Sequence, residues 1–277
     1  MLDSSVTKKI EAFVYLKPRS IQEIAQYLDK NWRTADRYVE EIEKNFGTLS
    51  TRVFREGTRG ALKIVFWASV DKVSHGVFQE KLEQDILKAR RKEDFSAFDI
   101  FQYVEADKKK VSGGYEEADN LPTMSKIISE AEKQVLIFSG NLSFINLDNK
   151  NANLFGAFES LIKKGVKIKI LCRVDIAGKE NVEKILSLNF KHGKEAVEIK
   201  HCEHPLRGFV VDNKILRLKE VKEPTGKIKE LNKKLFIYYT IKDKEWIEWI
   251  TKIFWKIFSS SFGAEKRMEE INRIKLK

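Results

Sequence analysis

The sequence predicts an α/β protein in two parts, a small N-terminal helix–turn–helix unit with a hairpin and a larger C-terminal α/β domain. Three observations predict this class. Two short amphipathic helices and two β-type runs follow one another between Pro18 and Trp67. From Leu121 onward, apolar strands alternate with helices, a pattern typical of a sheet covered on both faces. The chain of 277 residues is long enough to form two hydrophobic cores.

The first of the two short helices begins at a capping box, preceded by a helix over Thr7–Leu16. In the box, Ser20 and Glu23 satisfy backbone N–H groups that the first helical turn leaves without partners. Apolar residues then recur at helical spacing and form one stripe. These residues are Ile21, Ile24, Ala25 and Leu28. A polar break, Asp29–Asn31, separates this helix from the next.

The second helix places apolar and basic residues on opposite sides. The residues expected to be buried are Ala35, Val39, Ile42 and Phe46, and those expected to face outward are Arg33, Thr34, Arg37 and Tyr38. Gly47 is expected to end this helix, because glycine adopts the left-handed conformation of a C-terminal cap readily. Two β-type runs, Leu49–Arg55 and Ala61–Trp67, follow and form a hairpin.

A helix with Arg and Thr near its N-terminus can enter the major groove of DNA, where Arg recognises guanine. Arginines of the hairpin are expected to reach phosphates or the minor groove. The candidate DNA-binding residues are Lys30, Arg33, Thr34, Arg37, Tyr38, Arg52, Arg55 and Arg59. Alternatively, Arg33 and Arg37 form a solvated helix face paired with Asp36, Glu40 and Glu41. The stretch resembles a winged helix-turn-helix domain, which implies double-stranded DNA as partner, although such domains also serve as protein-interaction modules.

Charge and composition agree with a polyanionic partner. The net charge is +11 and the isoelectric point is about 9.4, although a chain rich in Lys and Glu can be basic for solubility alone. Cys172 and Cys202 both lie in apolar runs and do not indicate a disulfide framework. The sequence has no run of membrane-spanning length and no apolar signal core at its start. We expect a soluble cytoplasmic protein with no membrane partner, no cofactor and no metal.

Composition divides the chain into residues 1–70, 71–119 and 120–277. The middle segment contains a charged helix over His75–Lys92, which is either a strut between domains or, the preferred interpretation, half of a dimer seam. Residues 107–114, rich in Lys and Gly, are expected to form a solvated loop near the domain boundary.

The C-terminal part is expected to form a largely parallel sheet, whose ligand site would lie at the carboxyl ends of the strands. The polar residues at those ends are Ser139, Asn141, Arg173, Asp175, His201, Glu203, His204 and Arg207. They predict a small-molecule pocket, and the alternative is that they are ordinary loop residues. A final aromatic helix, Glu245–Phe258, is expected to pack in the core.

The segment Pro205–Lys214 resembles the phospholipase D motif His-x-Lys-x-x-x-x-Asp, with Arg207 at the Lys and Asp212 at the Asp. The resemblance implies a phospholipase D-like α/β domain in which the His is the nucleophile. Pro205 stands at that position, and His204 is one residue out of register, so we expect no enzyme activity. The candidate ligand-binding residues are Ser139, Asn141, Arg173, Arg207 and Asp212. Whether Arg207 and Asp212 bind a ligand or pair with each other is left open.

A winged helix-turn-helix joined to a phospholipase D-like domain without its nucleophile resembles the archaeal TrmB-type transcription regulators. The resemblance implies a homodimer that binds DNA through its N-terminal domain and senses a small effector, often a sugar, through its C-terminal domain. Two alternatives remain. One is an active phosphodiesterase or nuclease directed to nucleic acid, and the other is a non-specific DNA-coating protein.

Overall fold

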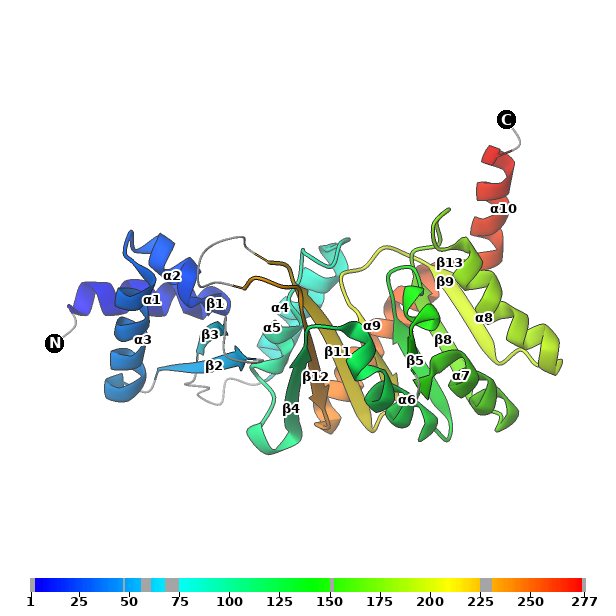
Figure 1. The fold of residues 1–277 in the computed structure, drawn as a ribbon, viewed down its shortest axis with the longest axis horizontal. Coiled ribbons are helices and arrows are strands. Elements are labelled where there is room, and N and C mark those ends of the chain that lie inside the picture. Colours follow the sequence, from blue (N-terminus) through cyan, green and yellow to red (C-terminus); the bar gives the residue numbers. More distant parts are fainter. Residues whose placement is uncertain are drawn as a thin grey trace.

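A computed structural model describes residues 3–46, 48–55, 61–67, 75–149, 152–224 and 231–275. It is a mixed α/β structure with one eight-stranded mixed sheet, one three-stranded sheet and one two-stranded sheet. The molecule is elongated, with the N-terminal unit at one end and the C-terminal helix at the other (Figure 1).

Three helices and three short strands form the N-terminal unit. The helices are α1 (Ser4–Leu16), α2 (Ile21–Tyr27) and α3 (Trp32–Phe46), and the strands are β1 (Arg19–Ser20), β2 (Leu49–Arg55) and β3 (Ala61–Trp67). The strands are antiparallel in the order β1-β3-β2. The core of the unit includes Ile10, Ile24, Val39 and Val65, all fully buried.

The capping box predicted at the start of α2 is confirmed. The Ser20 hydroxyl accepts a hydrogen bond from the Glu23 N–H at 3.2 Å, and the Glu23 carboxylate accepts one from the Ser20 N–H at 2.7 Å. The hairpin strands have the predicted bounds. Gly47 and the hairpin turn over residues 56–60 lie outside the described residues.

The large sheet has the order β13-β9-β8-β5-β10-β11-β12-β4. Its strands are β4 (Lys109–Gly114), β5 (Gln134–Phe138), β8 (Lys167–Cys172), β9 (Val197–His201), β10 (Gly208–Val211), β11 (Ile215–Lys222), β12 (Leu235–Ile241) and β13 (Phe262–Gly263). Only β5, β8 and β9 run parallel, and the other neighbours are antiparallel. The prediction of a largely parallel sheet is therefore wrong. The tight turn after β10 imposes an antiparallel pair, since parallel neighbours need a long crossover connection.

Helices cover both faces of this sheet, as predicted. On one face lie α6 (Leu121–Ser129), α7 (Leu154–Lys163) and α8 (Lys179–His192), and on the other lie α4 (His75–Lys88), α5 (Ala97–Phe101) and α9 (Lys244–Ser260). The remaining elements are α10 (Ala264–Lys275), the short hairpin β6 (Asp148–Asn149) with β7 (Ala152–Asn153), and the 3-10 turns η1 (Ala106–Lys108), η2 (Glu117–Asn120) and η3 (Ser143–Asn146). None of the helices in the described ranges could cross a membrane, because none is long and apolar enough.

The loop predicted over residues 107–114 is wrong for most of its length. Residues 109–114 form β4, which pairs with β12 at the edge of the large sheet. The Lys109 ammonium donates hydrogen bonds to the carbonyls of Phe101 at 2.9 Å and Gln102 at 3.2 Å, so this lysine is held by α5. The division at residue 119 stays a prediction.

The apolar side of α4 packs inside its own chain. Leu82 and Ile86 are buried in the core that α4 shares with α9, and Glu83 forms an ion pair with Lys256 of α9 at 2.7 Å. Leu82 and Ile86 of the proposed seam are therefore covered within the chain, and the dimer-seam interpretation stays a prediction. The strut interpretation agrees with this packing.

Candidate nucleic-acid interface and ligand site

The outward face of α3 carries two exposed arginines. Arg33 and Arg37 are both exposed, and their guanidinium groups lie 5.6 Å and 5.5 Å from the ring centres of Trp32 and Tyr38. Such cation–π contacts hold an arginine near the surface without neutralising its charge. Lys30, at the N-terminal side of the same helix, is also exposed.

The acidic neighbours on α3 are engaged elsewhere. Lys63 of β3 binds Asp36 at 2.5 Å and Glu40 at 3.0 Å on the side of α3 that faces the hairpin. Within the described part of the chain, neither Arg33 nor Arg37 forms an ion pair. Of the three carboxylates in the alternative, Asp36, Glu40 and Glu41, the first two bind Lys63 and pair with neither arginine among the described residues.

Thr34 has a local structural role. Its backbone N–H and its hydroxyl both donate to the Asn31 side-chain oxygen, at 2.9 Å and 3.1 Å. Asn31 thereby satisfies a backbone N–H at the start of α3, and the Thr34 hydroxyl is occupied by the same oxygen. Tyr38 is half-buried against the core of the N-terminal unit. The exposed predicted residues of this helix region are thus Lys30, Arg33 and Arg37.

The structure separates Arg52 from these residues. On the hairpin, Lys63 and Val65 face α3, whereas Phe54 and Ile64 face the large sheet and its helices. Arg52 lies two residues before Phe54 and opposite Ile64, so it is on the hairpin face directed at the large sheet. There, burial and the charge of Arg52 lower the pKa of Lys109. Arg52 therefore lies on a different face from Arg33 and Arg37, and it is exposed. Its expected contact with phosphates or the minor groove stays a prediction. The Arg55 side chain and Arg59 lie outside the described part of the chain.

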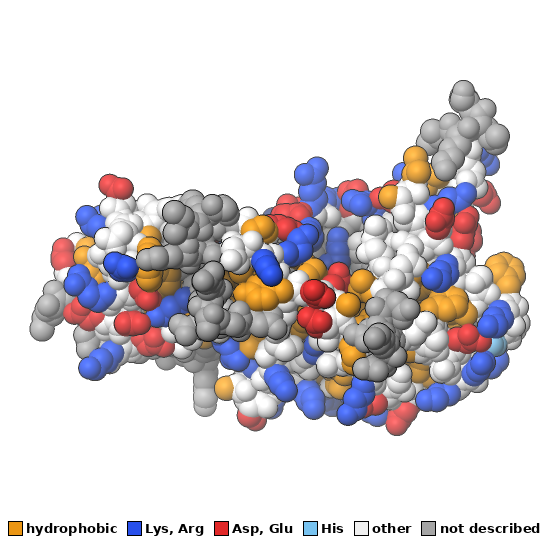
Figure 2. Space-filling model, viewed as in Figure 1, with side chains coloured by type: hydrophobic (Ala, Val, Ile, Leu, Met, Phe, Trp, Pro, Cys, Tyr) orange, Lys and Arg blue, Asp and Glu red, His pale blue; other side chains and the backbone are white. Residues whose placement is uncertain are grey.

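Basic side chains are not confined to this end of the molecule. Figure 2 shows Lys and Arg spread along the visible face and interspersed with Asp and Glu. The net charge alone therefore does not single out a binding surface, and the geometry of α3 is the more specific indication.

At the large sheet, the predicted polar residues meet at the carboxyl ends of β5, β8 and β9. The Ser139 N–H donates to the Leu171 carbonyl at 2.9 Å, and the Arg173 N–H donates to the Gly140 carbonyl at 2.7 Å. The connection 202–207 then crosses this edge, because β10 lies beyond β8 and β5 from β9. The residues that follow these strands therefore lie close together, and their role in binding a ligand stays a prediction.

Arg207 lies where this connection enters β10. Its guanidinium donates to the carbonyls of His204 at 3.0 Å and Leu206 at 2.6 Å. A Cβ at position 140 would lie 3.1 Å from the Arg207 Nε, so glycine there lets the guanidinium pass close to the backbone. Burial and the charge of Arg173 lower the pKa of Arg207, and no ion pair to it is formed within the described residues.

Asp212 lies at the opposite end of the strands, beside the start of β5. Gly208 pairs with Phe138 at the carboxyl end of β5, whereas the N–H of Asp212 bonds to the carbonyl of Gln134 at the other end. The Asp212 carboxylate accepts hydrogen bonds from the N–H groups of Glu132, Lys133 and Gln134 at 2.6, 2.9 and 2.7 Å. Asp212 therefore neither pairs with Arg207 nor shares a ligand site with it, because a four-residue strand separates them.

The histidines at this edge are both engaged in the fold. His204 is buried, with its Nε2 at 3.1 Å from the Leu171 carbonyl and its ring against Phe138. Burial lowers the pKa of His204 to about 3, so the imidazole is neutral at physiological pH. The His201 Nδ1 accepts a hydrogen bond from the Val174 N–H at 2.8 Å.

The other predicted site residues also have local partners. The Ser139 hydroxyl accepts from the N–H of Leu142 at 3.1 Å, and Asn141 accepts from the N–H of Ser143 at 3.3 Å. Arg173 is exposed and binds Asp175 at 2.7 Å. A small cavity of about 120 Å³ reaches Ser139, Asn141 and Arg207 but does not include Arg173.

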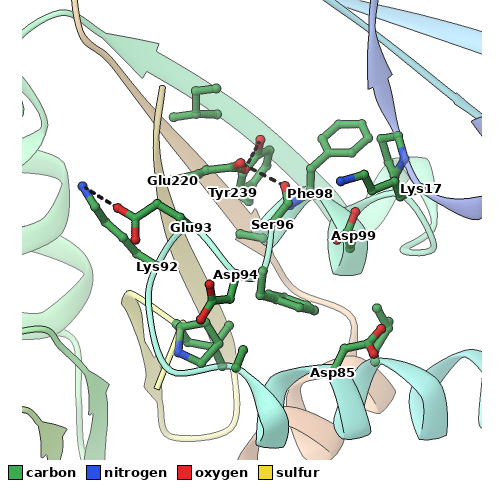
Figure 3. Close-up of a pocket in the computed structure, with 18 of the residues that line it drawn as sticks. Lys17, Asp85, Lys92, Glu93, Asp94, Ser96, Phe98, Asp99, Glu220 and Tyr239 are labelled. Atoms are coloured by element: carbon green, nitrogen blue, oxygen red, sulfur yellow. Dashed lines mark hydrogen bonds and ion pairs between the residues drawn. The ribbon is translucent and has the colours of Figure 1, made fainter. Parts of the chain in front are cut away.

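A larger cleft of about 740 Å³ lies between the N-terminal unit and the large sheet. Figure 3 shows the side chains of Ser96 and Tyr239 pointing to Glu220, with Asp99 close to Lys17. The Ser96 and Tyr239 hydroxyls donate to Glu220 at 2.9 Å and 3.1 Å. Burial, with the nearby Glu220 charge, raises the pKa of Asp99 to about 6.

Sequence reasoning missed the residues of this cleft and one further arginine. Asp99 lies among the apolar residues Phe98, Ile100 and Phe101, and Glu220 lies near the end of β11. Arg217 alternates with Leu216 and Leu218, the pattern of a strand with one solvated face. That face is instead covered by η2 and α6, which no local signal around Arg217 indicates.

No protein-family model matches the chain, and no curated protein is significantly similar to it. Solved structures with a related fold include TrmBL2, described as an archaeal chromatin protein with a novel mode of DNA binding. It is 16% identical, covers 94% of this chain and 93% of its own, and has a TM-score of 0.39.

Two further similar structures come from bacteria. Nuc from Salmonella typhimurium, a phospholipase D family member, is 11% identical over 56% of this chain and 97% of its own, with a TM-score of 0.39. NucT from Helicobacter pylori is 19% identical over 56% of this chain and 99% of its own, with a TM-score of 0.38. At these levels the similarities assign neither a family nor a function.

Proposed function

We propose that this chain is a DNA-binding transcription regulator in which the N-terminal unit acts as a winged helix-turn-helix. In this proposal α3 enters the major groove, and Arg33 and Arg37 contact base edges while Lys30 contacts phosphate. The observation that carries the proposal is the state of the two arginines. They are exposed, their positions are supported by aromatic rings, and the carboxylates of Asp36 and Glu40 are bound to Lys63.

The geometry around α3 supports a reading helix in a second way. Asn31 caps its start, and three of its apolar residues, Ala35, Val39 and Ile42, are buried in the N-terminal core. The helix is thus fixed by its inner face, and its outer face is available for a partner. An ordered reading helix loses little conformational freedom on binding, which favours specific recognition.

The larger C-terminal part, in this proposal, is a phospholipase D-like domain without catalytic activity that takes part in dimerisation and effector sensing. The chemistry of its residues supports the inactive assignment. Pro205 occupies the position of the nucleophile, and His204 is buried with its Nε2 directed at a backbone carbonyl. A covalent mechanism requires a nucleophile that reaches the substrate together with a base to activate it.

Selection from a genomic duplex library at physiological salt tests the regulator proposal. We expect the full-length protein to enrich a defined sequence, and we expect its affinity for that sequence to exceed its affinity for random duplex by about 10³-fold or more. Equal recovery of all sequences would contradict the proposal and would instead support a non-specific DNA-coating protein.

A nuclease assay separates the remaining alternative. The purified protein should not cleave single- or double-stranded DNA or a phosphodiester model substrate. Turnover that is lost in His204→Ala and retained in Asp99→Asn would contradict the inactive assignment and support a phosphodiesterase.

A further inference from the structure

Arg217 is a buried cation in the middle of the large sheet. It lies on β11 between Leu216 and Leu218, and only 5% of its surface is exposed. It points to the face of the sheet covered by η2 and α6, opposite to the face that carries α5 and α9. An arginine stays protonated in such surroundings, since its pKa in water is far above neutral.

Every hydrogen-bond partner of this guanidinium is uncharged. It donates to Thr240 Oγ1 at 2.5 Å, to Asn120 Oδ1 at 2.5 Å and to Ser112 Oγ at 3.5 Å. Its plane lies 5.1 Å from the ring centre of Tyr238, and its buried Nε has no partner. Within the described residues no carboxylate pairs with Arg217, and the Glu117 carboxylate near the same cavity is bound to Lys219. A buried charge without a counter-ion is costly, so this arrangement lacks an anion.

A cavity of about 120 Å³ opens beside the guanidinium. A second, half-buried cation, Arg207, lines the same cavity and also has no ion pair within the described ranges. The rest of the wall is largely apolar and includes Leu121, Met124 and Phe144. Two arginines without counter-ions therefore meet an apolar wall in one open cavity, which we name the Arg217 pocket.

We propose that the Arg217 pocket binds a small organic anion, a carboxylate attached to an apolar group. The carboxylate would accept hydrogen bonds from the Arg217 guanidinium, and the apolar group would contact the wall formed by α6 and η3. Charge-assisted hydrogen bonds to a guanidinium are among the strongest in proteins, and burial in a low-dielectric site strengthens them further. Binding at this pocket does not depend on the proposed DNA-binding role.

The apolar wall distinguishes this ligand from an inorganic anion. Chloride or phosphate would satisfy the charge of Arg217 but would leave the surface of Leu121, Met124 and Phe144 against solvent. Each buried CH₂ group of an organic acid adds affinity. The proposal therefore predicts an order of affinity among simple acids as well as the identity of the cation that binds them.

Isothermal titration of the full-length protein with acetate, hexanoate, benzoate, benzamide and inorganic phosphate tests this proposal. We expect saturable binding of hexanoate or benzoate, tighter than that of acetate or phosphate. Benzamide has the same shape as benzoate without its charge, and we expect its affinity to be lower by about tenfold or more. Failure of all the organic acids to saturate a site, equal binding of benzoate and benzamide, or tighter binding of phosphate would each overturn the proposal.

Two variants locate the site. Arg217→Gln removes the charge and should weaken binding of the organic acid by about tenfold or more. Arg273→Gln removes an exposed arginine of α10 and should leave it unchanged. Unchanged binding in a folded Arg217→Gln protein, or equal loss in both variants, would overturn the assignment to Arg217. Should Arg217→Gln fail to fold, the comparison of the acids on the wild-type protein still decides the proposal.

Discussion

Asp212 has a structural role, because its carboxylate accepts hydrogen bonds from three backbone N–H groups. Burial opposes ionisation of its carboxylate, but three backbone N–H donors outweigh this effect and hold its pKa below the usual range. The lowered pKa in the folded state determines how this carboxylate changes stability with pH. Asp212 stabilises the fold above its unfolded pKa of about 4, and this contribution is lost as the pH falls through the lower folded value.

Asp212→Ala should lower the free energy of unfolding by about 2–3 kcal/mol at pH 7, because three N–H groups lose their acceptor. Asp212→Asn should cost less, since its amide oxygen still accepts and asparagine tolerates the positive φ of 49°. Urea unfolding, monitored by circular dichroism, measures the unfolding free energy of both variants. Equal stability of wild type and Asp212→Ala would contradict the role given to these hydrogen bonds.

The pKa of Asp99 is shifted in the opposite direction from that of Asp212. Its pKa is raised to about 6, first by burial and then by the Glu220 charge, while Lys17 and Lys222 oppose the shift. The folded state therefore binds a proton that the unfolded state releases near pH 4, so stability from this group rises as the pH falls from 6 towards 4. Asp99→Asn should add about 1–2 kcal/mol at pH 7, discounted for its remaining exposure, and should flatten the pH profile of unfolding.

Asp85→Asn is the matched control for Asp99→Asn, because Asp85 lines the same cleft but is exposed. Its pH profile of unfolding should follow that of the wild type. An Asp99→Asn profile that also follows the wild type between pH 4 and 7 would contradict the raised pKa.

Single residues were predictable where the local pattern determines exposure. The outward positions of Arg33 and Arg37 follow from helical spacing around Ala35 and Val39. Arg52 and Arg217 were not predictable, since alternation along a strand assigns two faces but does not say what covers each. The hairpin faces the large sheet on one side, and η2 covers the side of β11 that carries Arg217.

At the scale of elements, the pairing of β10 with β11 depends on one glycine. Gly208 has φ +155°, and a Cβ there would lie 2.1 Å from the Arg217 carbonyl oxygen. Gly208→Ala should therefore cost about 3 kcal/mol or more in unfolding free energy. Gly193→Ala, with φ +58° and open space around its Cβ, should cost only about 1 kcal/mol. Thermal unfolding compares the two, and equal losses would contradict the close approach of the strands.

Elements with strong local signals were predicted well, whereas the pairing of the strands in the large sheet was not. The capping box fixed the start of α2, and the hairpin strands had the expected bounds. The mixed strand directions of the large sheet were not predicted. Strand β4 was not predicted either, because Lys109–Gly114 has the composition of a loop. It becomes a strand through pairing with β12, a long-range contact that local sequence does not encode.

At the scale of the whole molecule, the N-terminal unit and the C-terminal helix lie at opposite ends of the long axis. The N-terminal unit projects from one end of the long axis, and α4 packs on α9 as a strut (Figure 1). A cleft lined by Lys17 and Glu220 lies between the unit and the sheet. The cleft was not predictable from the sequence, since it forms only where residues distant in the chain meet.

Salt dependence tests the contribution of charge to DNA binding. Affinity for random duplex should fall steeply between 50 and 200 mM salt, with a logarithmic slope of about −0.9 for each phosphate contacted. Lys30→Ala should reduce this slope by about 1 and weaken all sequences alike. An unchanged slope in Lys30→Ala, measured by fluorescence anisotropy, would contradict its assignment to a phosphate.

The most direct measurement is the ratio of affinities for the selected and random duplexes, by fluorescence anisotropy at physiological salt, in Arg37→Ala and Arg273→Ala. Each variant removes one exposed arginine, the first from α3 and the second from α10. We predict that Arg37→Ala lowers the ratio by about 5–100-fold, equivalent to ~1–3 kcal/mol, and that Arg273→Ala leaves it unchanged. A ratio that is the same in wild type and both variants would contradict the reading of DNA by α3.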